Sequence, residues 1–595
     1  MAARQRSLGV QWQAERDTAL GTRDPITTPV VPARRPSEGG VALRFPPQSK
    51  APHAFRGRRS EIGPMKSRRA FLKAGVAGAA ACLAGCEKTP RTFPGTILGA
   101  GRAAGHRLRD AHEGTFPAPS EEHGVRCVII GGGIAGLAAA RRLAQRGMDD
   151  FLLVELEPSV GGNSASGSNH IAAYPWGAHY LPIPNDESTE VIALLGELNL
   201  IRGRDATGAL LCDEEMLCAD PNERLFDQGR WHEGLVPQLG LSAGDREQYA
   251  RFSAQMDTFR HARGSDGRRA FSIPLDLSSR DAELIALDRI TMSAWLAQNG
   301  CDSAPLLWHV DYCCRDDYGA GSAQVSAWAG IHYFASRNAH AAATEHDTVF
   351  TWPEGNGWLV RRIAEPVREH IRTGCIVFNV EPHADGARVD FFDLAAGKSI
   401  RLRASRVICA APRFVAQRFI RGIAPASGLE YSPWMVANIT LDALPAGHGS
   451  PLAWDNVMRG SRSLGYVVAT HQHLHPVPRG TVLTHYWPLD DSPPRDARTQ
   501  ALACTHADWC AQIVADLRHP HADIAAHIRR VDVWLWGHGM IRPVPGFIWG
   551  DTRRQMLAPH GAIHFAHSDM SGISIFEEAY TRGCHAADAV LASAL

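Results

Sequence analysis

One stretch near residue 130 constrains the fold more than any other part of the 595-residue chain. Residues 125–130 form a short apolar run typical of a buried parallel strand. A glycine-rich turn follows at 131–136, and residues 137–147 are predicted to form a helix that ends at a glycine. A second apolar strand, 151–154, ends in the acidic residue Glu155. This order predicts an α/β fold with a parallel sheet whose first turn binds a dinucleotide.

Each position in this unit has a physical role in holding a pyrophosphate. Gly131 allows the tight turn, Gly133 lets the backbone approach the phosphates, and Gly136 lets the helix pack on the strand. The helix start offers unpaired N–H groups and a positive dipole end, and Glu155 can accept the ribose hydroxyls. The predicted phosphate-binding residues are Gly131, Gly133, Ile134, Ala135 and Gly136.

A second glycine pair, six residues past Glu155, indicates FAD rather than NAD. The segment 158–163 contains that pair, and the block 174–180 has the order Tyr-Pro-Trp-Gly-Ala-His-Tyr. Both resemble segments of the flavin-containing amine oxidase superfamily, which includes protoporphyrinogen oxidase, carotenoid desaturases and L-amino-acid oxidases. Blocks at 352–359, 376–412 and 561–583 resemble later segments of that family in the same order. The resemblance therefore covers nearly all of the chain after residue 125.

The resemblance implies FAD as cofactor and assigns it contacts beyond the first turn. The backbone around Val380 would meet the adenine, and Asp569 would lie near the ribityl chain. The further implied FAD contacts are Gly161, Gly162, Asn163, Trp176, Gly177, Ala178, Val380, Pro412 and Asp569.

The chain departs from the family in its basic residues. Ser159 and Asn163 stand where the family often has arginine around the glycine pair. The family commonly places a lysine, through water, at the flavin N5 atom, but Lys398 is the one lysine after residue 90. Lys398 lies in a polar turn between two predicted strands, which is typical of a solvated position. The amine-oxidase chemical step therefore does not carry over in that form.

Segments 186–345 and 426–534 fit no nucleotide pattern and are predicted to form a substrate domain inserted into the fold. Aromatic residues near a flavin can enclose an apolar or cationic substrate, although such residues more often fill a core. His179, Trp536 and His538 are the candidate catalytic residues near the isoalloxazine ring. The histidines of 471–475 alternate along a predicted strand, but no further ligand at a diagnostic spacing supports a metal, so none is predicted.

The first 122 residues are not predicted to join this fold. Residues 1–64 are rich in Arg, Pro, Gly and Ala and are predicted to be disordered or not translated. Residues 65–86 resemble a twin-arginine export signal, with Arg68 and Arg69 before a weakly apolar run that ends in a lipobox at Cys86. Residues 87–122 are predicted to be a tether. These features predict export, with a membrane anchor through lipidated Cys86 or, if the signal is cleaved without lipidation, a soluble periplasmic protein.

Composition limits the class of function. The 62 basic and 62 acidic side chains give zero net charge, which argues against a nucleic-acid-binding protein. The predicted architecture is α/β: an FAD-binding, Rossmann-like domain formed by 123–185, 346–425 and 535–595, with an inserted α+β substrate domain. The predicted function is an exported FAD-dependent oxidoreductase that takes a hydride equivalent from a C–N or C–C bond of a small amine-like or amino-acid-like molecule. The alternatives are a desaturase or isomerase of an apolar substrate, and a non-catalytic lipoprotein with the FAD fold.

Overall fold

The nucleotide-binding sheet has seven strands, and the predicted unit forms its centre. A computed structural model describes residues 92–99, 101–339, 341–342, 344, 348–473 and 479–593. The strand order is β12-β3-β2-β15-β14-β13, with β21 beside β15. Strands β12, β3, β2, β15 and β21 are parallel, whereas β14 and β13 form an antiparallel extension. The strands are β2 Glu121–Ile130, β3 Phe151–Val154, β12 Ile371–Arg372, β13 Cys375–His383, β14 Gly386–Asp393, β15 Lys398–Cys409 and β21 Ile563–Phe565.

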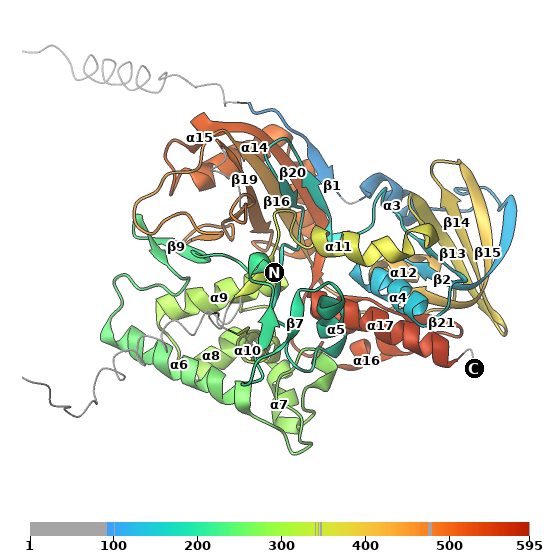
Figure 1. Cartoon of the computed structure of the whole chain (residues 1–595), viewed down its shortest axis with the longest axis horizontal. Helices are drawn as coiled ribbons and strands as arrows, with labels where there is room; N and C mark the ends of the chain where they lie inside the picture. Colours follow the sequence, from blue (N-terminus) through green and yellow to red (C-terminus); the bar gives the residue numbers. More distant parts are fainter. Residues whose placement is uncertain are drawn as a thin grey trace, which may run out of the picture. The chain divides into compact units, whose positions relative to one another are not determined.

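Two helices pack side by side against this sheet (Figure 1). Helix α4 (Ile134–Gln145) follows the glycine turn, and helix α17 (Phe576–Ala592) ends the fold. They approach so closely that a Cβ on Gly583 would lie 2.1 Å from the carbonyl oxygen of Ala135. Helix α11 (Gly357–Ala364) also packs on α4. These helices bury one face of the parallel strands, as expected for an α/β layer.

The second sheet has eight strands in the order β1-β20-β16-β19-β18-β17-β9-β10. Period-two alternation in β16 sends Met435, Ala437 and Ile439 into the core beneath two helices, while Trp434 and Val436 face the opposite core. The two helices are α13 (Pro494–Ala503) and α14 (His506–Leu517). The strands are β1 Ile97–Gly99, β9 Glu223–Asp227, β10 Arg230–Glu233, β16 Tyr431–Leu441, β17 Asp455–Met458, β18 Tyr466–Val468, β19 Thr481–Pro488 and β20 Ile528–Ile541.

Of the remaining helices, α6, α8, α9 and α10 form the core on the opposite face of this sheet, whereas α5 packs on α17, α12 on β13 and α15 on α14. The helices are α5 Thr189–Glu197, α6 Ala243–His261, α7 Ala282–Ala286, α8 Met292–Gln298, α9 Ala304–Tyr318, α10 Ala327–Ala335, α12 Arg413–Phe419, α15 Ile524–His527 and α16 Asp551–Leu557. Three short strand pairs are β4 Ser166–Ser168 with β5 Ala173–Pro175, β6 Tyr180–Pro182 with β11 Val349–Thr351, and β7 Ile201–Arg204 with β8 Leu210–Cys212. No helix in the described ranges is both long and apolar enough to cross a bilayer.

The structure differs from the expected domain limits in three places. Residues 92–109, expected to belong to a tether, form β1 and helix α3 (Arg102–Arg109), because backbone groups of 94–99 pair with β20. Strand β20 continues in the eight-stranded sheet to Ile541, so the nucleotide-binding part does not resume at 535. Apolar residues of 191–217, expected in the substrate domain, pack into the core around α4 and α17. Residues 1–91, which hold the predicted signal and lipobox, lie outside the described residues.

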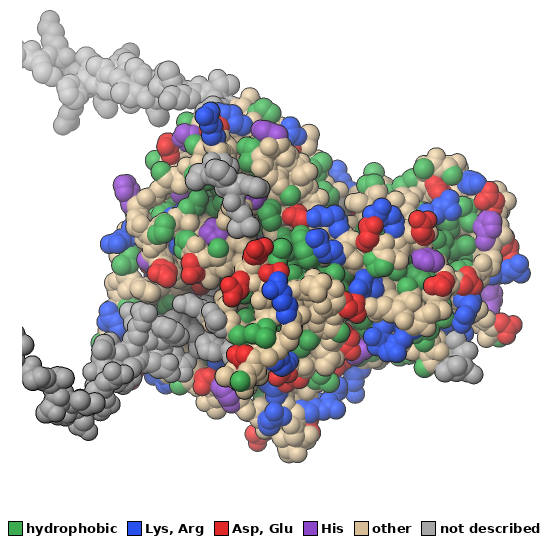
Figure 2. All heavy atoms as spheres, in the orientation of Figure 1, with side chains coloured by type: hydrophobic (Ala, Val, Ile, Leu, Met, Phe, Trp, Pro, Cys, Tyr) green, Lys and Arg blue, Asp and Glu red, His purple; other side chains and the backbone are tan. Residues whose placement is uncertain are grey.

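Charged side chains are distributed without a large patch of one sign on the face in Figure 2, where Lys and Arg alternate with Asp and Glu. Many of them are paired: Arg372 contacts Asp393, and Arg401 contacts Asp390 at 2.7 Å. At these positions, opposite charges are therefore balanced locally, in keeping with the zero net charge of the chain. Such pairs contribute little to stability when they are exposed.

Candidate flavin and substrate site

The glycine turn between β2 and α4 is shaped for a ligand. Gly131 has φ +105°, and a Cβ there would lie 3.1 Å from the Ala410 carbonyl group. A Cβ on Gly136 would lie 1.8 Å from the Gly131 carbonyl oxygen, so both positions need glycine for packing. At Gly133, however, a Cβ would meet nothing within 4 Å. The space in front of Gly133 is therefore open, at the end of a helix that has no capping side chain.

Glu155 lies beside this turn with its carboxylate already oriented. The Gly132 N–H donates to Oε2, and the Glu157 N–H donates to Oε1 at 2.8 Å. Burial raises the pKa of Glu155, and these backbone donors oppose that rise. Each carboxylate oxygen retains a lone pair that can accept a ribose hydroxyl. The carbonyl of Arg372 in β12 accepts the Glu155 N–H at 2.9 Å, so β12 borders the predicted ribose site.

The second glycine pair crosses over the first turn. Gly161 and Gly162 have φ +131° and +54°, and the Gly161 N–H donates to the Gly132 carbonyl at 2.9 Å. Asn163 then accepts the Ala178 N–H at 2.8 Å through its carbonyl oxygen. A Cβ on Gly177 would lie 2.3 Å from that same oxygen. The structure thus brings the two predicted glycine segments and the 176–178 block into contact.

A cavity of about 330 Å³ opens next to Asn163 and Gly177. The amide of Asn163 donates to the Gly539 carbonyl at 2.5 Å. The Tyr486 hydroxyl donates to the Gly177 carbonyl at 2.9 Å, and the Trp536 indole N–H donates to the Trp176 carbonyl at 2.7 Å. The cavity is lined by Asn163, Gly177, Trp434, Val436, Tyr486, Trp536, Gly539 and Met540. We call it the aromatic cavity.

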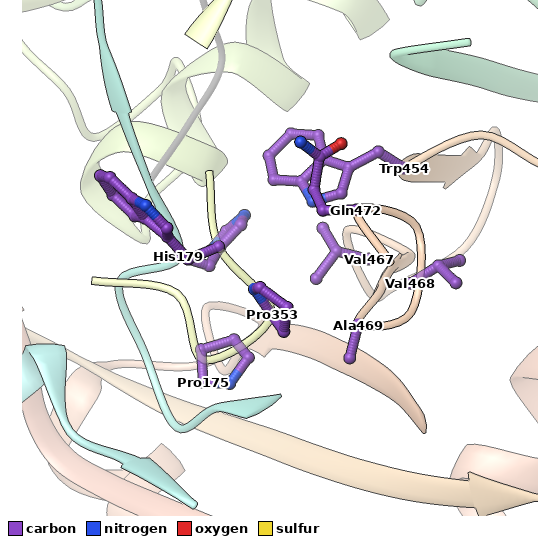
Figure 3. Close-up of a pocket in the computed structure, with 9 residues that line it drawn as sticks. Pro175, His179, Pro353, Trp454, Val467, Val468, Ala469 and Gln472 are labelled. Carbon is purple, nitrogen blue, oxygen red and sulfur yellow. The ribbon is translucent and has the colours of Figure 1, made fainter. Parts of the chain in front are cut away.

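A second cavity, of about 240 Å³, lies next to His179. His179 lines it and also stacks on Tyr486, which lines the aromatic cavity. Its walls come from three separate stretches of chain, as Figure 3 shows. The lining residues are Pro175, His179, Trp352, Pro353, Trp454, Val467, Val468, Ala469 and Gln472. We call it the outer cavity, and no Arg or Lys is among the described residues that line either one.

The predicted catalytic residues do not all meet at one point. Trp536 lines the aromatic cavity and His179 the outer cavity, but His538 lines neither. The His538 ring instead stacks on Phe414 of α12, 4.2 Å between centroids. Partial burial and then Arg498 and Arg418 lower the pKa of His538 to about 4.

Val380 does not lie where the adenine contact was expected. In the register of the sheet, Val380 of β13 pairs with Val389 of β14. Val389 pairs with Leu402 of β15, and Leu402 pairs with His123 of β2. His123 is eight residues before Gly131, or about 26 Å along an extended strand. Strand β12, which was not singled out, pairs with β3 and lies beside Glu155 instead, so the contact implied for Val380 by the resemblance falls too far along the sheet.

Asp569 and Pro412 lie together behind the turn. Pro412 precedes the first residue of α12, and the Arg413 N–H donates to Asp569 at 2.9 Å. The Tyr431 hydroxyl donates to the same carboxylate at 2.6 Å. Burial alone would raise the pKa of Asp569, but His567 and these donors outweigh it and the pKa is lowered. The Asp569 carboxylate is thus engaged by protein donors, and the structure supports a positioning role for it.

The residues present fit a bound FAD. Helix α4 leaves N–H donors toward the open space at Gly133, where a diphosphate would sit. Helix α17 also begins without a capping side chain, at Ile575. Ser574, the residue before Ile575, accepts the Ile541 N–H at 3.1 Å through its hydroxyl oxygen. Ile541 is next to Met540 of the aromatic cavity. The second uncapped helix start therefore lies close to where the flavin ring would sit, with donors for its carbonyl oxygens.

Trp434, Val436 and Tyr486 were not predicted as site residues. They come from β16 and β19, which are neighbours in the sheet but about fifty residues apart in sequence. Their signal was the alternation of bulky residues in 431–441 and 481–488, which marks two-sided strands but not the ligand they face. Lys398 lies at the surface, where its ammonium contacts Glu121. Within the described part of the chain, no group of three or more His, Cys, Asp or Glu residues is placed to hold a metal ion.

Comparison with known proteins finds a matching family and several chains of similar fold. A sequence model described as flavin containing amine oxidoreductase matches residues 134–591. A curated relative from Methylobacillus flagellatus, a bifunctional protein of tRNA 5-methylaminomethyl-2-thiouridine biosynthesis, is 34% identical over 157 residues. That match covers 25% of this chain and 23% of the relative's length.

Several solved structures share the fold. Putrescine oxidase bound to putrescine has a TM-score of 0.59 and 16% identity, over 79% of this chain and 100% of its own. Cyclohexylamine oxidase from Brevibacterium oxydans IH-35A has a TM-score of 0.57 and 17% identity, over 79% and 99%. A fatty acid isomerase from P. acnes that produces CLA has a TM-score of 0.55 and 14% identity, over 79% and 98%.

Proposed function

Because the chain belongs to the flavin-containing amine oxidoreductase family and is an FAD-dependent oxidoreductase, we propose that it oxidises the C–N bond of a small amine with an apolar carbon skeleton. Bound FAD would supply the acceptor for the two electrons and the hydrogen. The part of this chain is to hold the substrate carbon against the flavin and to keep water out.

The observation that carries this proposal is the combination of aromatic walls with nearby carboxylates. Trp434, Tyr486 and Trp536 present three aromatic side chains to one cavity. Burial raises the pKa of Tyr486, and the buried carboxylates of Asp455 and Asp316 raise it further. Aromatic faces and negative potential both attract an ammonium group. The same surroundings disfavour a carboxylate, since neither cavity lining offers a cation.

The outer cavity supports an apolar skeleton. Its walls are largely proline, valine and tryptophan, and Gln472 is already committed to the backbone of 217–219. A diamine would have to place its second ammonium in this cavity, where the lining has no carboxylate. Desolvating an unpaired charge there is costly. The proposed substrates are therefore monoamines, a narrower class than the amine-like or amino-acid-like molecules that the sequence predicts.

A second candidate function is isomerisation or desaturation of an apolar molecule. The described residues that line the two cavities are largely apolar and include no lysine. Both features favour this second function, because such reactions need no lysine at the flavin. The fatty acid isomerase shows that the fold occurs with such an activity. A fatty acid, however, brings a carboxylate that the described lining residues do not pair.

The test is anaerobic reduction of the FAD-loaded protein by a substrate panel. Cyclohexylamine and benzylamine should bleach the visible flavin band, putrescine should do so at least about tenfold more slowly, and linoleate should neither bleach it nor change its own ultraviolet spectrum. Bleaching by putrescine alone, or conversion of linoleate, would overturn the monoamine proposal. A purified protein that takes up no FAD would support a non-catalytic lipoprotein.

We further propose that the chain is exported and lipid-anchored, on the strength of residues 65–86 in the sequence. The small-molecule substrate would then be met outside the cytoplasm. Replacing both Arg68 and Arg69 by Lys should leave the protein in the cytoplasmic fraction. Cys86→Ser should abolish labelling by radioactive palmitate, and retained labelling would contradict the anchor.

A further inference from the structure

The first described residues form a strap that joins the eight-stranded sheet to the nucleotide site. We define the N-terminal strap as residues 92–110. Its first half is β1, which adds a parallel edge strand to β20 with Ile97 opposite Val533. The Val531 N–H donates to the Pro94 carbonyl at 2.9 Å, and the Val533 N–H donates to the Thr96 carbonyl at 2.9 Å. This half is fixed by backbone hydrogen bonds.

The second half of the strap is helix α3, which packs beside the loop that follows β3. A Cβ on Gly101 would lie 2.6 Å from Oε1 of Glu157, and a Cβ on Gly105 would lie 4.0 Å from the Leu156 side chain. Burial raises the pKa of Glu157, and a backbone hydrogen bond from Gly101 opposes that rise. Glu157 is two residues past Glu155, so the start of α3 borders the predicted ribose site.

Helix α3 packs against the nucleotide-binding sheet through one arginine and one leucine. The Arg107 guanidinium lies over the rings of Phe116 and Phe392, at 4.9 and 4.3 Å from their centroids. Phe116 in turn stacks on Phe378 of β13 at 4.6 Å, and Leu108 packs against the core of the antiparallel strands. Arg109, by contrast, forms a surface ion pair with the adjacent Asp110.

The far end of α3 carries charges that act on residues of α12 and β20. Arg418 of α12 helps lower the pKa of Asp110, after Arg109 has done so. His106 and Arg418 both contribute to the lowered pKa of His538. Strands β3, β2 and β15 are consecutive in the sheet, and α12 follows β15. Helix α3 therefore lies beside the loop after β3 and packs on β13, at one end of the nucleotide-binding sheet (Figure 1).

We propose that the N-terminal strap is a clasp that retains the nucleotide half of the bound FAD. The strap precedes residue 134, where the match to the family begins. The basic residues of helix α3 are Arg102, His106, Arg107 and Arg109, and the helix has no acidic residue, which suits a neighbour of an anionic diphosphate. The inference rests on FAD as cofactor and does not depend on the amine substrate.

Hydrogen exchange on the full chain tests the contact without relying on activity. The FAD-free and FAD-loaded proteins are compared, with residues 243–261 of α6 as the internal control. Bound FAD should slow exchange of the 101–110 amides and leave the control unchanged. Equal exchange of 101–110 in the two forms would overturn the clasp.

A matched pair of variants tests retention. Arg107→Ala removes the cation–π contacts and should speed FAD release about fivefold, measured as the recovery of free-flavin fluorescence. Arg109→Ala makes the same change in charge on the same helix and should release FAD at the wild-type rate. Equal release rates in the two variants would overturn the proposal. A protein that bleaches with monoamines yet shows equal rates would contradict the clasp alone and leave the proposed function intact.

Discussion

The imidazole of His179 lies on the ring of Tyr486, with 4.5 Å between centroids and 26° between planes. Tyr486 lines the aromatic cavity and His179 lines the outer cavity, so this stack is the wall that the two cavities share. A substrate that extends from one cavity to the other must pass this pair. The stack therefore controls how a long substrate would be seated.

Substitution of Tyr486 should separate the effect of its ring from that of its hydroxyl. Tyr486→Ala removes the aromatic wall and the support of His179, and kcat/KM for the best monoamine should fall by about a hundredfold. Tyr486→Phe keeps the ring stack on His179 and loses the hydrogen bond to Gly177. The net free energy of that hydrogen bond is about 1 kcal/mol. Steady-state kinetics with FAD-saturated protein provide the measurement. Equal losses in the two variants would show that the hydroxyl, and not the ring, matters.

Gly133→Ala should remove FAD binding while leaving the fold unchanged. Gly133 has φ −70°, which alanine adopts readily, and the added methyl would meet no protein atom within 4 Å. The methyl would instead occupy the space proposed for the diphosphate. Gly124→Ala is the matched control, because a Cβ there also meets nothing within 4 Å. Titration of FAD into the stripped proteins should show weaker binding in the first variant only, at equal melting temperatures without FAD.

Lys398→Ala should leave catalysis unchanged. The ammonium of Lys398 contacts Glu121 at the partly exposed start of β15, far along the sheet from its carboxyl end. An exposed pair of this kind contributes little to stability. Stopped-flow reduction of the flavin by a monoamine should give the same rate in both proteins. A tenfold slower rate would place a lysine back in the chemical step.

Acid should destabilise the protein through two buried histidines. Burial lowers the pKa of His332 to about 3 and that of His521 to about 4. An unfolded histidine binds its proton near pH 6.5, so the unfolded chain holds more protons between about pH 6.5 and 4. Stability is therefore present above about pH 6.5 and is lost as pH falls, by about 2 kcal/mol per histidine at pH 5.

Denaturant unfolding at pH 7 and pH 5 measures this loss. His521→Gln should reduce it by about half, although that variant also disturbs the hydrogen bonds of His521 to Tyr466 and Ala446. His170→Gln, which changes an exposed histidine, should leave the loss unchanged. A pH-independent free energy of unfolding in the wild type would contradict the assignment.

The nucleotide turn could be predicted because its parts are contiguous in the chain. The sequence features of residues 125–155 all lie within about thirty residues of one another, and glycines at fixed spacing report packing directly. The position of Val380 could not be predicted in this way. The place beside β3 is taken by the two-residue strand Ile371–Arg372 and not by the longer strand 375–383. Periodicity does not show such a short strand.

The aromatic cavity could not be predicted from the sequence, for a different reason. Its walls come from strands that the chain visits at 434, 486 and 536, and only their pairing in the sheet brings them together. His538 shows the limit of reasoning by proximity in sequence. It is two residues from Trp536, which lines the cavity, yet its ring stacks on Phe414 of α12. The three-residue strand β1 was likewise too short for any pattern to predict.

Strand β1 also decides how a pull on the N-terminus would be borne. If Cys86 carries a lipid, five residues separate it from Thr92, and thermal motion of the protein against the membrane is transmitted to β1. Two backbone hydrogen bonds, from the Val531 N–H to the Pro94 carbonyl and from the Val533 N–H to the Thr96 carbonyl, add to the parallel pairing of β1 with β20. Thr96 adds a third link, through its N–H to Asp532 at 3.2 Å. A lipid on Cys86 would therefore be tied to the edge of the eight-stranded sheet ahead of helix α3 in the chain.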